Sequence, residues 1–352
     1  MPDVDVVVIG AGVMGAATAR AVARRGRDVL LLERFEVGHS RGSSHGASRI
    51  FRFSYHHPMY VRMAMEALSL WRDLEEESVR SILTVTGGLD VGPTLPLHVE
   101  ALEACGVRYE LLDGREVGRR FALTFPPEAS VLYQADSGVL AADVAVRALI
   151  NSALSNGAEL REGTPVTGVS EIGGGVEIRV GSEGITARTA VVTAGAWGRG
   201  LLAGAGVDLP VWPTRETVVY FRLEGDGEPA SPTVVEWTHP PVYALSSAGQ
   251  EVKCGHHRAG PSVDPDEPGE ADLDSVQELT RWIGERYPAA DPTPLRSETC
   301  LYTNTADESF VLERHGRIVV GSPCSGHGFK FAPLIGERLA DLAEERTGVA
   351  AP

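Results

Sequence analysis

Lysine is the residue type that this sequence nearly lacks. Lys253 and Lys330 are the only two lysines among 32 basic residues, and all the others are arginine. An arginine bias of this kind is typical of a codon preference, so each lysine that remains is a candidate for a role that needs a compact ammonium group. Both lysines are therefore candidate functional residues.

Long apolar runs and paired cysteines are also scarce. No stretch approaches the roughly 18 apolar residues of a membrane span, and Asp3 and Asp5 interrupt the N-terminal run, which disfavours a secretory signal. The four cysteines share no Cys-x-x-Cys spacing, so we expect neither a disulfide scaffold nor a metal site. A net charge of −16 disfavours binding to nucleic acid or anionic membranes. We expect a cytoplasmic protein.

The length of 352 residues corresponds to about two domains. Strand–helix patterns occur at the start, in the middle and at the end of the chain, and β-rich blocks lie between them. We expect an α/β protein of two domains (α+β in overall organisation). A discontinuous Rossmann-like nucleotide-binding domain would comprise residues 1–80, 141–210 and 300–352. An antiparallel-sheet substrate domain would comprise residues 81–140 and 211–299.

Hydrophobic periodicity and glycine positions predict the individual elements. The expected strands are residues 4–9, 28–33, 177–178, 187–193 and 317–321, and the expected helices are 14–25, 59–77, 143–156, 272–287 and 334–347. Residues 81–140 read as short strands and turns, residues 211–254 as antiparallel strands, and residues 258–268 as a polar loop.

A glycine fingerprint joins the first expected strand to the first helix. Gly10, Gly12 and Gly15 have the spacing GxGxxG, and Glu33 lies at the end of the next strand. Gly10 permits the tight turn, Gly12 lets the backbone approach a pyrophosphate, and Gly15 lets the helix lie close to the strand. The helix N-terminus attracts the anion, and Glu33 can accept hydrogen bonds from a ribose. The motif predicts dinucleotide binding without distinguishing FAD from NAD.

Four further motifs accompany the fingerprint: GSSHGASRIFR at residues 42–52, KCGHH at 253–257, CLYT at 300–303 and GHGFKF at 326–331. Together they resemble the monomeric sarcosine oxidase and N-methyltryptophan oxidase family, which belongs to the D-amino-acid-oxidase-like flavoproteins. The resemblance runs over nearly the whole chain. It implies covalently held FAD and oxidation of a C–N bond, with hydride transfer to flavin N5, an imine product and reoxidation by O2 to hydrogen peroxide.

The resemblance implies roles for individual residues. Cys300 matches the flavin-linking cysteine, and the alternative is a small buried apolar residue. Arg52 and Lys330 match the pair that holds a substrate carboxylate, with an ordinary ion pair as the alternative for Arg52. Lys253 matches the lysine that activates oxygen. His45 and Arg49 match residues near the flavin. Tyr243 and His257 match side chains that shape the substrate cavity, with ordinary packing as the alternative for both.

The cofactor-binding residues implied by the resemblance form a larger set. They are Gly10, Gly12, Met14, Gly15, Glu33, Arg34, Ser43, Ser44, Arg49, Val166, Ala194, Gly195, Trp197, Cys300, Gly326, Gly328, Phe329 and Lys330.

The resemblance implies an oxidase of an N-methyl or cyclic amino acid that acts as a monomer on a small molecule and O2. Ser44 and residues 53–58 depart from the family pattern, which puts sarcosine itself in doubt as the substrate. The alternatives are a flavin dehydrogenase that passes electrons to a carrier and an oxidase of primary amino acids such as glycine or D-amino acids. Two others are a non-catalytic FAD-binding subunit and an NAD-dependent dehydrogenase. His56, His57 and His256 are expected to be solvated.

Overall fold

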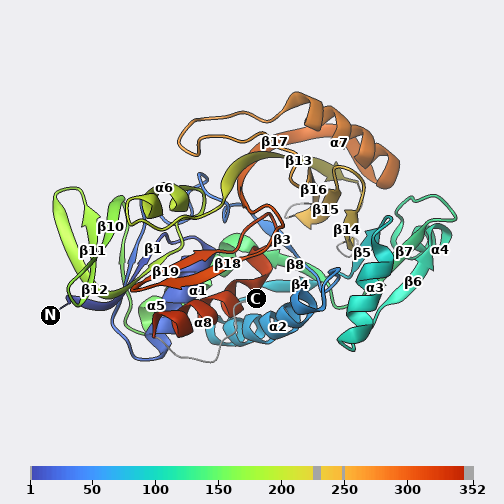
Figure 1. Cartoon of the computed structure of the whole chain (residues 1–352). Coiled ribbons are helices and arrows are strands. Elements are labelled where there is room, and N and C mark those ends of the chain that lie inside the picture. Colours follow the sequence, from blue (N-terminus) through green and yellow to red (C-terminus); the bar gives the residue numbers. More distant parts are fainter. Residues whose placement is uncertain (1, 225–230, 248–249, 345–352) are drawn as a thin grey trace.

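The computed structural model describes residues 2–224, 231–247 and 250–344 (Figure 1). Two large sheets with different connectivity lie on either side of a smaller one, and helices cover their outer faces. Within these residues no helix is long and apolar enough to cross a membrane.

The first sheet contains the glycine fingerprint. Its strand order is β10-β11-β12-β1-β2-β9, with β19 paired to β12 and β18 paired to β19. Strand β1 runs parallel to both β2 and β12. The strands of this sheet are β1 (Val4–Ile9), β2 (Val29–Leu32), β9 (Glu159–Arg161), β10 (Val166–Ile172), β11 (Gly175–Val180), β12 (Glu183–Val192), β18 (Val311–His315) and β19 (Ile318–Ser322).

Strand β1 is buried on both faces, which explains its continuous apolar sequence. Val6 and Val8 pack into a core shared with helices, whereas Val7 and Ile9 pack into a second core on the opposite face. A parallel strand in this position has no solvent-facing side and therefore no polar alternation. The expected strand at residues 4–9 is confirmed.

Four helices cover the first of these faces: α1 (Val13–Arg24), α2 (Pro58–Ser78), α5 (Ala142–Ser155) and α8 (Ala332–Ala343). Helix α1 packs against both α5 and α8. The approach to α8 is close, because a Cβ on Gly336 would lie 2.6 Å from the Ala17 carbonyl oxygen. Gly157 follows α5 with φ at 94°, as expected for a glycine that ends a helix. The expected end of the last helix at residue 347 lies outside the described residues.

The second sheet has the order β17-β13-β16-β15-β14-β5-β7-β6, and all its pairs are antiparallel except β14 with β5. Helix α7 (Leu273–Arg286) packs against β13, β16 and β17 (Figure 1). The strands are β5 (Gly88–Val91), β6 (Glu110–Asp113), β7 (Ser130–Gln134), β13 (Trp212–Leu223), β14 (Thr233–Glu236), β15 (Val242–Ser247), β16 (Glu251–His256) and β17 (Ala290–Asn304).

Two helices in residues 81–140 were not expected. Helix α3 (Leu95–Ala104) and helix α4 (Gly114–Phe121) stand where the sequence predicts only strands and turns. The Asp113 side chain accepts a hydrogen bond from the Glu116 N–H at 2.8 Å and so caps α4. Both helices are short and flanked by glycine or proline, and turn signals therefore dominated the prediction.

A small third sheet lies between the two large ones. Its order is β3-β8-β4, with strands β3 (Ser48–Phe51), β8 (Gly138–Ala141) and β4 (Leu83–Val85). The expected division into two domains remains a prediction. The expected boundary at residue 300 falls inside β17, which stays paired with β13 as far as Asn304.

Candidate functional site

A single cavity of about 1270 Å³ brings together residues from all three sheets. Its volume exceeds the roughly 300–1,000 Å³ of a pocket for one small ligand. Except for Gly15, which lies beneath the turn, every site residue expected from the sequence lines this cavity: Gly10, Gly12, Met14, Glu33, Arg34, Ser43, Ser44, His45, Arg49, Arg52, Val166, Ala194, Gly195, Trp197, Tyr243, Lys253, His257, Cys300, Gly326, Gly328, Phe329 and Lys330.

The glycine turn has room for backbone but not for side chains. Gly10 has φ at 98°, and a Cβ there would lie 2.8 Å from the Thr193 carbonyl oxygen. A Cβ on Gly15 would lie 1.8 Å from the Gly10 carbonyl oxygen. Gly12 is the N-cap of α1 and offers no side-chain cap, while the Val13 N–H donates to the Ser44 hydroxyl at 3.0 Å. The helix N-terminus therefore faces the cavity in a form that suits a phosphate group.

Glu33 stabilises this turn directly. Its carboxylate accepts hydrogen bonds from the N–H groups of Ala11 at 2.7 Å and Phe35 at 2.9 Å. Burial raises the pKa of Glu33, but hydrogen bonds from His39, Phe35 and Ala11 outweigh that effect and keep the pKa below its usual value. An ionised Glu33 thus binds the turn and also lines the cavity, where a ribose could reach it.

Asp266, in the loop that follows β16, contacts two residues of the cavity lining. Its Oδ1 accepts hydrogen bonds from Arg34 Nη1 at 2.8 Å and from the Trp197 indole at 2.9 Å. Trp197 ends the short helix η1 (Gly195–Trp197), which precedes α6 (Gly198–Ala203). The expected polar loop at 258–268 therefore contacts two residues that the sequence predicted to bind cofactor.

Arg49 organises the loop before β3. Its guanidinium donates to the carbonyl oxygens of Ser43, His45 and Ser48 at 2.7–2.8 Å. Burial, Arg49 and Lys253 together lower the pKa of His45 to about 4, so its imidazole is neutral at physiological pH.

Several polar atoms of the cavity lining have no hydrogen-bond partner among the described residues. They are His45 Nε2, Ser48 Oγ, Thr94 Oγ1, Thr303 Oγ1 and Ser322 Oγ. Buried polar groups normally have hydrogen-bond partners, so five atoms without one around a single cavity indicate a polar ligand. Together with the glycine turn, they fit a dinucleotide cofactor.

Lys253 and Cys300 lie on β16 and β17, on either side of β13 in the sheet. Lys253 is 6% exposed and its Nζ donates to the Ser48 carbonyl oxygen at 3.4 Å. Burial, followed by the charge of Arg49, lowers the pKa of Lys253 to about 7. Burial raises the pKa of the Cys300 thiol, while Arg49 and Lys253 partly oppose this. Lys253 therefore changes charge close to neutral pH.

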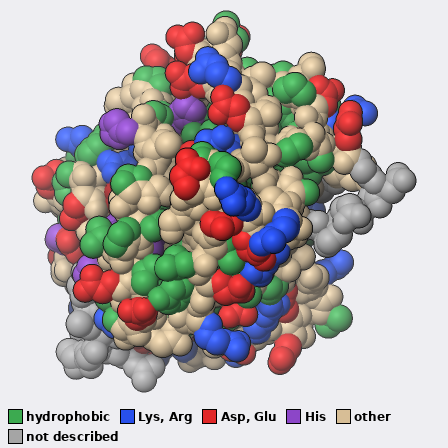
Figure 2. Space-filling model, turned by 90° about the vertical axis from the view of Figure 1, so that its right-hand side faces the viewer, with side chains coloured by type: hydrophobic (Ala, Val, Ile, Leu, Met, Phe, Trp, Pro, Cys, Tyr) green, Lys and Arg blue, Asp and Glu red, His purple; other side chains and the backbone are tan. Residues whose placement is uncertain are grey.

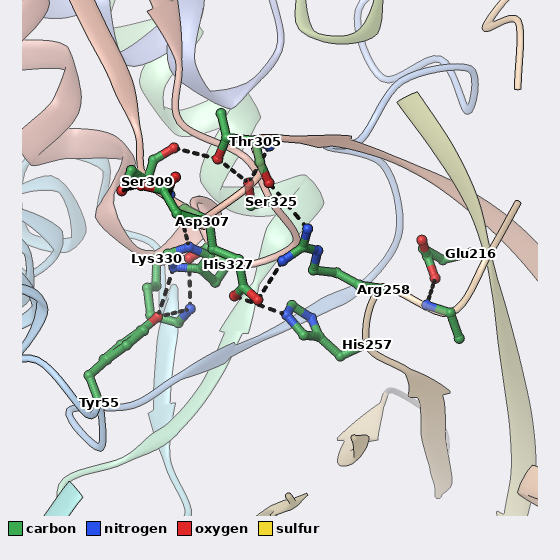
Figure 3. Close-up of polar contacts among 12 residues, drawn as sticks. Tyr55, Glu216, His257, Arg258, Thr305, Asp307, Ser309, Ser325, His327 and Lys330 are labelled. Carbon is green, nitrogen blue, oxygen red and sulfur yellow. Dashed lines mark hydrogen bonds and ion pairs between the residues drawn. The ribbon is translucent and has the colours of Figure 1, made fainter. Parts of the chain in front are cut away.

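Arg52 and Lys330 meet at the other end of the cavity through Tyr55. Lys330 Nζ donates to the Tyr55 hydroxyl and to the His327 carbonyl oxygen, both at 2.8 Å (Figure 3). The Arg52 guanidinium lies over the Tyr55 ring, 4.3 Å from its centroid. Burial and the charge of Arg52 lower the pKa of Lys330 well below its usual value. Lys330 belongs to helix η2 (Phe329–Phe331), and its carbonyl accepts the Trp71 indole N–H at 2.8 Å.

A buried carboxylate behind Arg52 was not predicted. Asp90 Oδ1 lies 3.7 Å from Arg52 Nη1 and accepts the Trp237 indole N–H at 2.9 Å. Ser54 connects this group to His98, whose Nδ1 lies 2.8 Å from the Ser54 hydroxyl. Burial is the largest effect and raises the pKa of Asp90 above its usual value, although Arg52 and hydrogen bonds from Trp237 and Ser54 oppose the rise. A lone acid in the apolar strand Gly88–Val91 was the available sequence signal.

The cavity rim carries an acidic residue that was also missed. Glu308 pairs with Arg258 at 2.6 Å and with His257 at 3.5 Å. Although burial raises the pKa of Glu308, His257 and Arg258 lower it to about 2. In Figure 3, His257 and Arg258 lie on the same side of Lys330 and His327.

Of the three histidines expected to be solvated, His56 and His57 are exposed, and His57 Nδ1 accepts the Met59 N–H at 3.1 Å. The prediction for His256 was wrong, since it is 7% exposed. β16 is an interior strand between β13 and β15, which explains the burial.

Acidic and basic side chains are interspersed over the face in Figure 2, so the negative charge of the chain is not gathered into one patch there.

Comparisons with known proteins agree with the sequence resemblance. A family model described as FAD dependent oxidoreductase matches residues 5–342. The human peroxisomal sarcosine oxidase is 34% identical over 97% of this chain and 93% of its own length. The N-methyl-L-tryptophan oxidase of Salmonella arizonae is 28% identical over 97% of this chain and 95% of its own.

A similar solved structure is that of NikD, an unusual amino acid oxidase essential for nikkomycin biosynthesis. It superposes with a TM-score of 0.90 and 29% identity, covering 99% of this chain and 96% of that one. The relatives confirm the resemblance to sarcosine and N-methyltryptophan oxidases, and the matched fold confirms the expected α/β architecture with a dinucleotide-binding layer.

Proposed function

The chain belongs to the FAD-dependent oxidoreductase family, and from that premise we propose that it oxidises a secondary amino acid, N-methylated or cyclic, to an imine. FAD supplies the electron-accepting chemistry, and reoxidation by O2 yields hydrogen peroxide. The proposal extends to a monomeric, cytoplasmic enzyme without nucleic-acid or membrane partners.

The observation that carries the proposal is the pair of buried cations joined by Tyr55. Arg52 is 8% exposed and Lys330 is 5% exposed, and both line the cavity. A buried guanidinium beside a buried amine, which a bound anion would keep protonated, is suited to an anionic group, and a carboxylate is the anion that an amino acid provides. We infer that Arg52 and Lys330 hold this carboxylate and so fix the orientation of the amine.

The surroundings of the amine favour its neutral form. The cations Arg52 and Lys330 and the neutral His45 offer no counter-charge to a protonated amine, and burial disfavours that charge further. An amine must lose its proton before its C–N bond can be oxidised. His257 and Tyr243 are proposed to shape the space that the substrate occupies.

Lys253 is proposed to assist dioxygen. It is buried, it lies beside Arg49 and Cys300, and an ammonium there would stabilise the negative charge that dioxygen acquires with its first electron. Cys300 is proposed to attach the cofactor covalently, which its place in the cavity lining supports. His45 and Arg49 would then lie near the attached ring system.

The test begins with the spectrum of acid-precipitated protein. A yellow pellet is expected if FAD is covalent, and a yellow supernatant would refute attachment through Cys300. A panel of N-methyl, cyclic and primary amino acids is then mixed with the protein without oxygen, and bleaching of the flavin identifies the substrate class. One peroxide per substrate in air is expected, and bleaching that only an artificial electron carrier reverses would favour a dehydrogenase instead.

A further inference from the structure

The carboxylate of Asp90 lies directly behind Arg52 and does not line the cavity. It is 2% exposed, and the pairing of β5 with β14 brings it to Trp237, which follows β14. The Trp237 N–H donates to Val91 O at 2.7 Å, which fixes the backbone beside Asp90. Asp90 is thus a buried carboxyl group, held in place on the far side of a guanidinium that faces the ligand space, and the Arg52 charge and the Trp237 N–H favour its ionised form.

The Arg52 guanidinium therefore has the Asp90 carboxyl group on one side and the cavity on the other. Its Nη1 donates to the Ser54 carbonyl oxygen and lies 3.7 Å from Asp90 Oδ1. Its planar group also lies over Trp237, 5.1 Å from the ring centroid. Lys330 differs, because both of its hydrogen-bond acceptors, the Tyr55 hydroxyl and the His327 carbonyl, are uncharged.

The charges at this end of the cavity can be compared with those of a ligand. A bound carboxylate favours the protonated form of Lys330, whose pKa burial and Arg52 otherwise lower. With that ligand in place, Arg52 and Lys330 oppose the single acid Asp90 and leave the equivalent of one positive charge. The neighbouring Glu308 already pairs with Arg258, so it adds little to this balance. One ligand carboxylate neutralises the remaining charge, whereas a second would lie close to Asp90 without a cation of its own.

We propose that Asp90 is a specificity-determining positioning residue that acts through Arg52. It offsets one of the two cavity cations, so the site accepts amino acids with a single carboxylate and rejects those with an acidic side chain. This inference rests on the proposed function of Arg52 and Lys330, and it adds that the substrate has an uncharged side chain. Specificity of this kind is a difference between two affinities, set here by a repulsive element.

The experiment titrates the holoenzyme with acetate and with malonate, at constant ionic strength and at a pH at which both malonate carboxyls are ionised. The readout is the perturbation of the visible flavin spectrum. The unsubstituted protein should prefer acetate. Removing a negative charge next to the site in Asp90→Asn should tighten both anions, and because malonate carries two charges its affinity relative to acetate should rise about tenfold.

Glu236→Gln is the matched control. Glu236 lies on the neighbouring strand β14 and has the same kinds of partner, with Trp282 Nε1 at 2.7 Å and Arg286 Nε at 3.0 Å. It does not line the cavity. Both substitutions remove a carboxylate from an Arg–Trp cluster, so both should lower stability, but only Asp90→Asn should change the malonate-to-acetate ratio.

A second variant covers the case in which Asp90→Asn does not fold. Trp237→Phe keeps a ring beneath Arg52 and removes the N–H that Asp90 accepts, so the carboxylate is less stabilised and a smaller shift in the same direction is expected. An unchanged ratio in the folded variants would overturn the inference and leave the proposed function standing. If neither anion perturbs the spectrum of the unsubstituted protein, the carboxylate-binding role of Arg52 and Lys330 itself is refuted.

Discussion

Replacing Lys253 by methionine should slow flavin reoxidation by dioxygen about a thousandfold. Lys253 is 6% exposed, so its charge acts in a poorly screened environment. A unit charge about 4 Å from a developing negative charge, at an effective dielectric constant of about 20, contributes about 4 kcal/mol. That energy corresponds to about three powers of ten in rate. Methionine has a similar length and no charge, so the loss isolates the electrostatic effect.

The pH dependence provides a second signature of the same group. Because burial and Arg49 lower the pKa of Lys253 to about 7, the ammonium is present below that pH and lost above it. Reoxidation of the unsubstituted protein should therefore slow as the pH rises through about 7. In Lys253→Met this dependence should disappear.

Stopped-flow absorbance separates the two half-reactions, namely anaerobic reduction by substrate and reoxidation by dissolved oxygen. Lys330→Met is the control, since it removes the other lysine of the chain. It should raise the substrate concentration needed for half-maximal reduction and leave reoxidation within a few-fold of its original rate. If Lys253→Met slowed both half-reactions equally, or left the pH dependence intact, the assigned role would be refuted.

Three further predictions concern the cofactor and the rim. Cys300→Ser should move the flavin from the pellet to the supernatant on acid precipitation, and retention in the pellet would identify a different attachment. Gly15→Ala should lower stability by about 1–3 kcal/mol in urea unfolding and reduce the bound FAD per chain, because its Cβ would lie 1.8 Å from the Gly10 carbonyl oxygen. The pKa of Glu308 falls from 4.5 to about 2 on folding, so it stabilises the fold above pH 4.5 and loses this effect as the pH falls toward 2. The stability difference between the unsubstituted protein and Glu308→Gln should shrink over that range, and a difference independent of pH would contradict the ion pair.

What the sequence could predict depended on whether the signal was local. Three contiguous elements were predicted from local patterns: strand β1, the glycine turn and helix α1. The apolar run is typical of a buried parallel strand, and the glycine spacing is typical of a tight turn before a helix. The short helices α3 and α4 carry weaker periodicity than the turn signals around them, and they were missed. The predicted exposure of His256 was also wrong, since its burial follows from the strands on either side of β16 rather than from the sequence of β16 itself.

The residues of the candidate site also differ in whether a local sequence motif contains them. Residues in motifs, such as Arg52 and Lys330, could be named from the sequence, and the structure brings them to one cavity. Asp90 and Trp237 could not, because they meet only when β5 pairs with β14, more than a hundred positions along the chain. Such long-range pairings leave no periodic signature in a single sequence.

The burial of both lysines has a practical consequence for handling this protein. Lys253 is 6% exposed and Lys330 is 5% exposed, so the folded exterior offers no lysine side chain to acylating dyes, aldehyde cross-linkers or amine-coupled resins. Both lysines line the ligand cavity, so a reagent can reach them only through that cavity or after the fold opens. Peptide mass spectrometry of labelling with and without a bound ligand would separate these two routes.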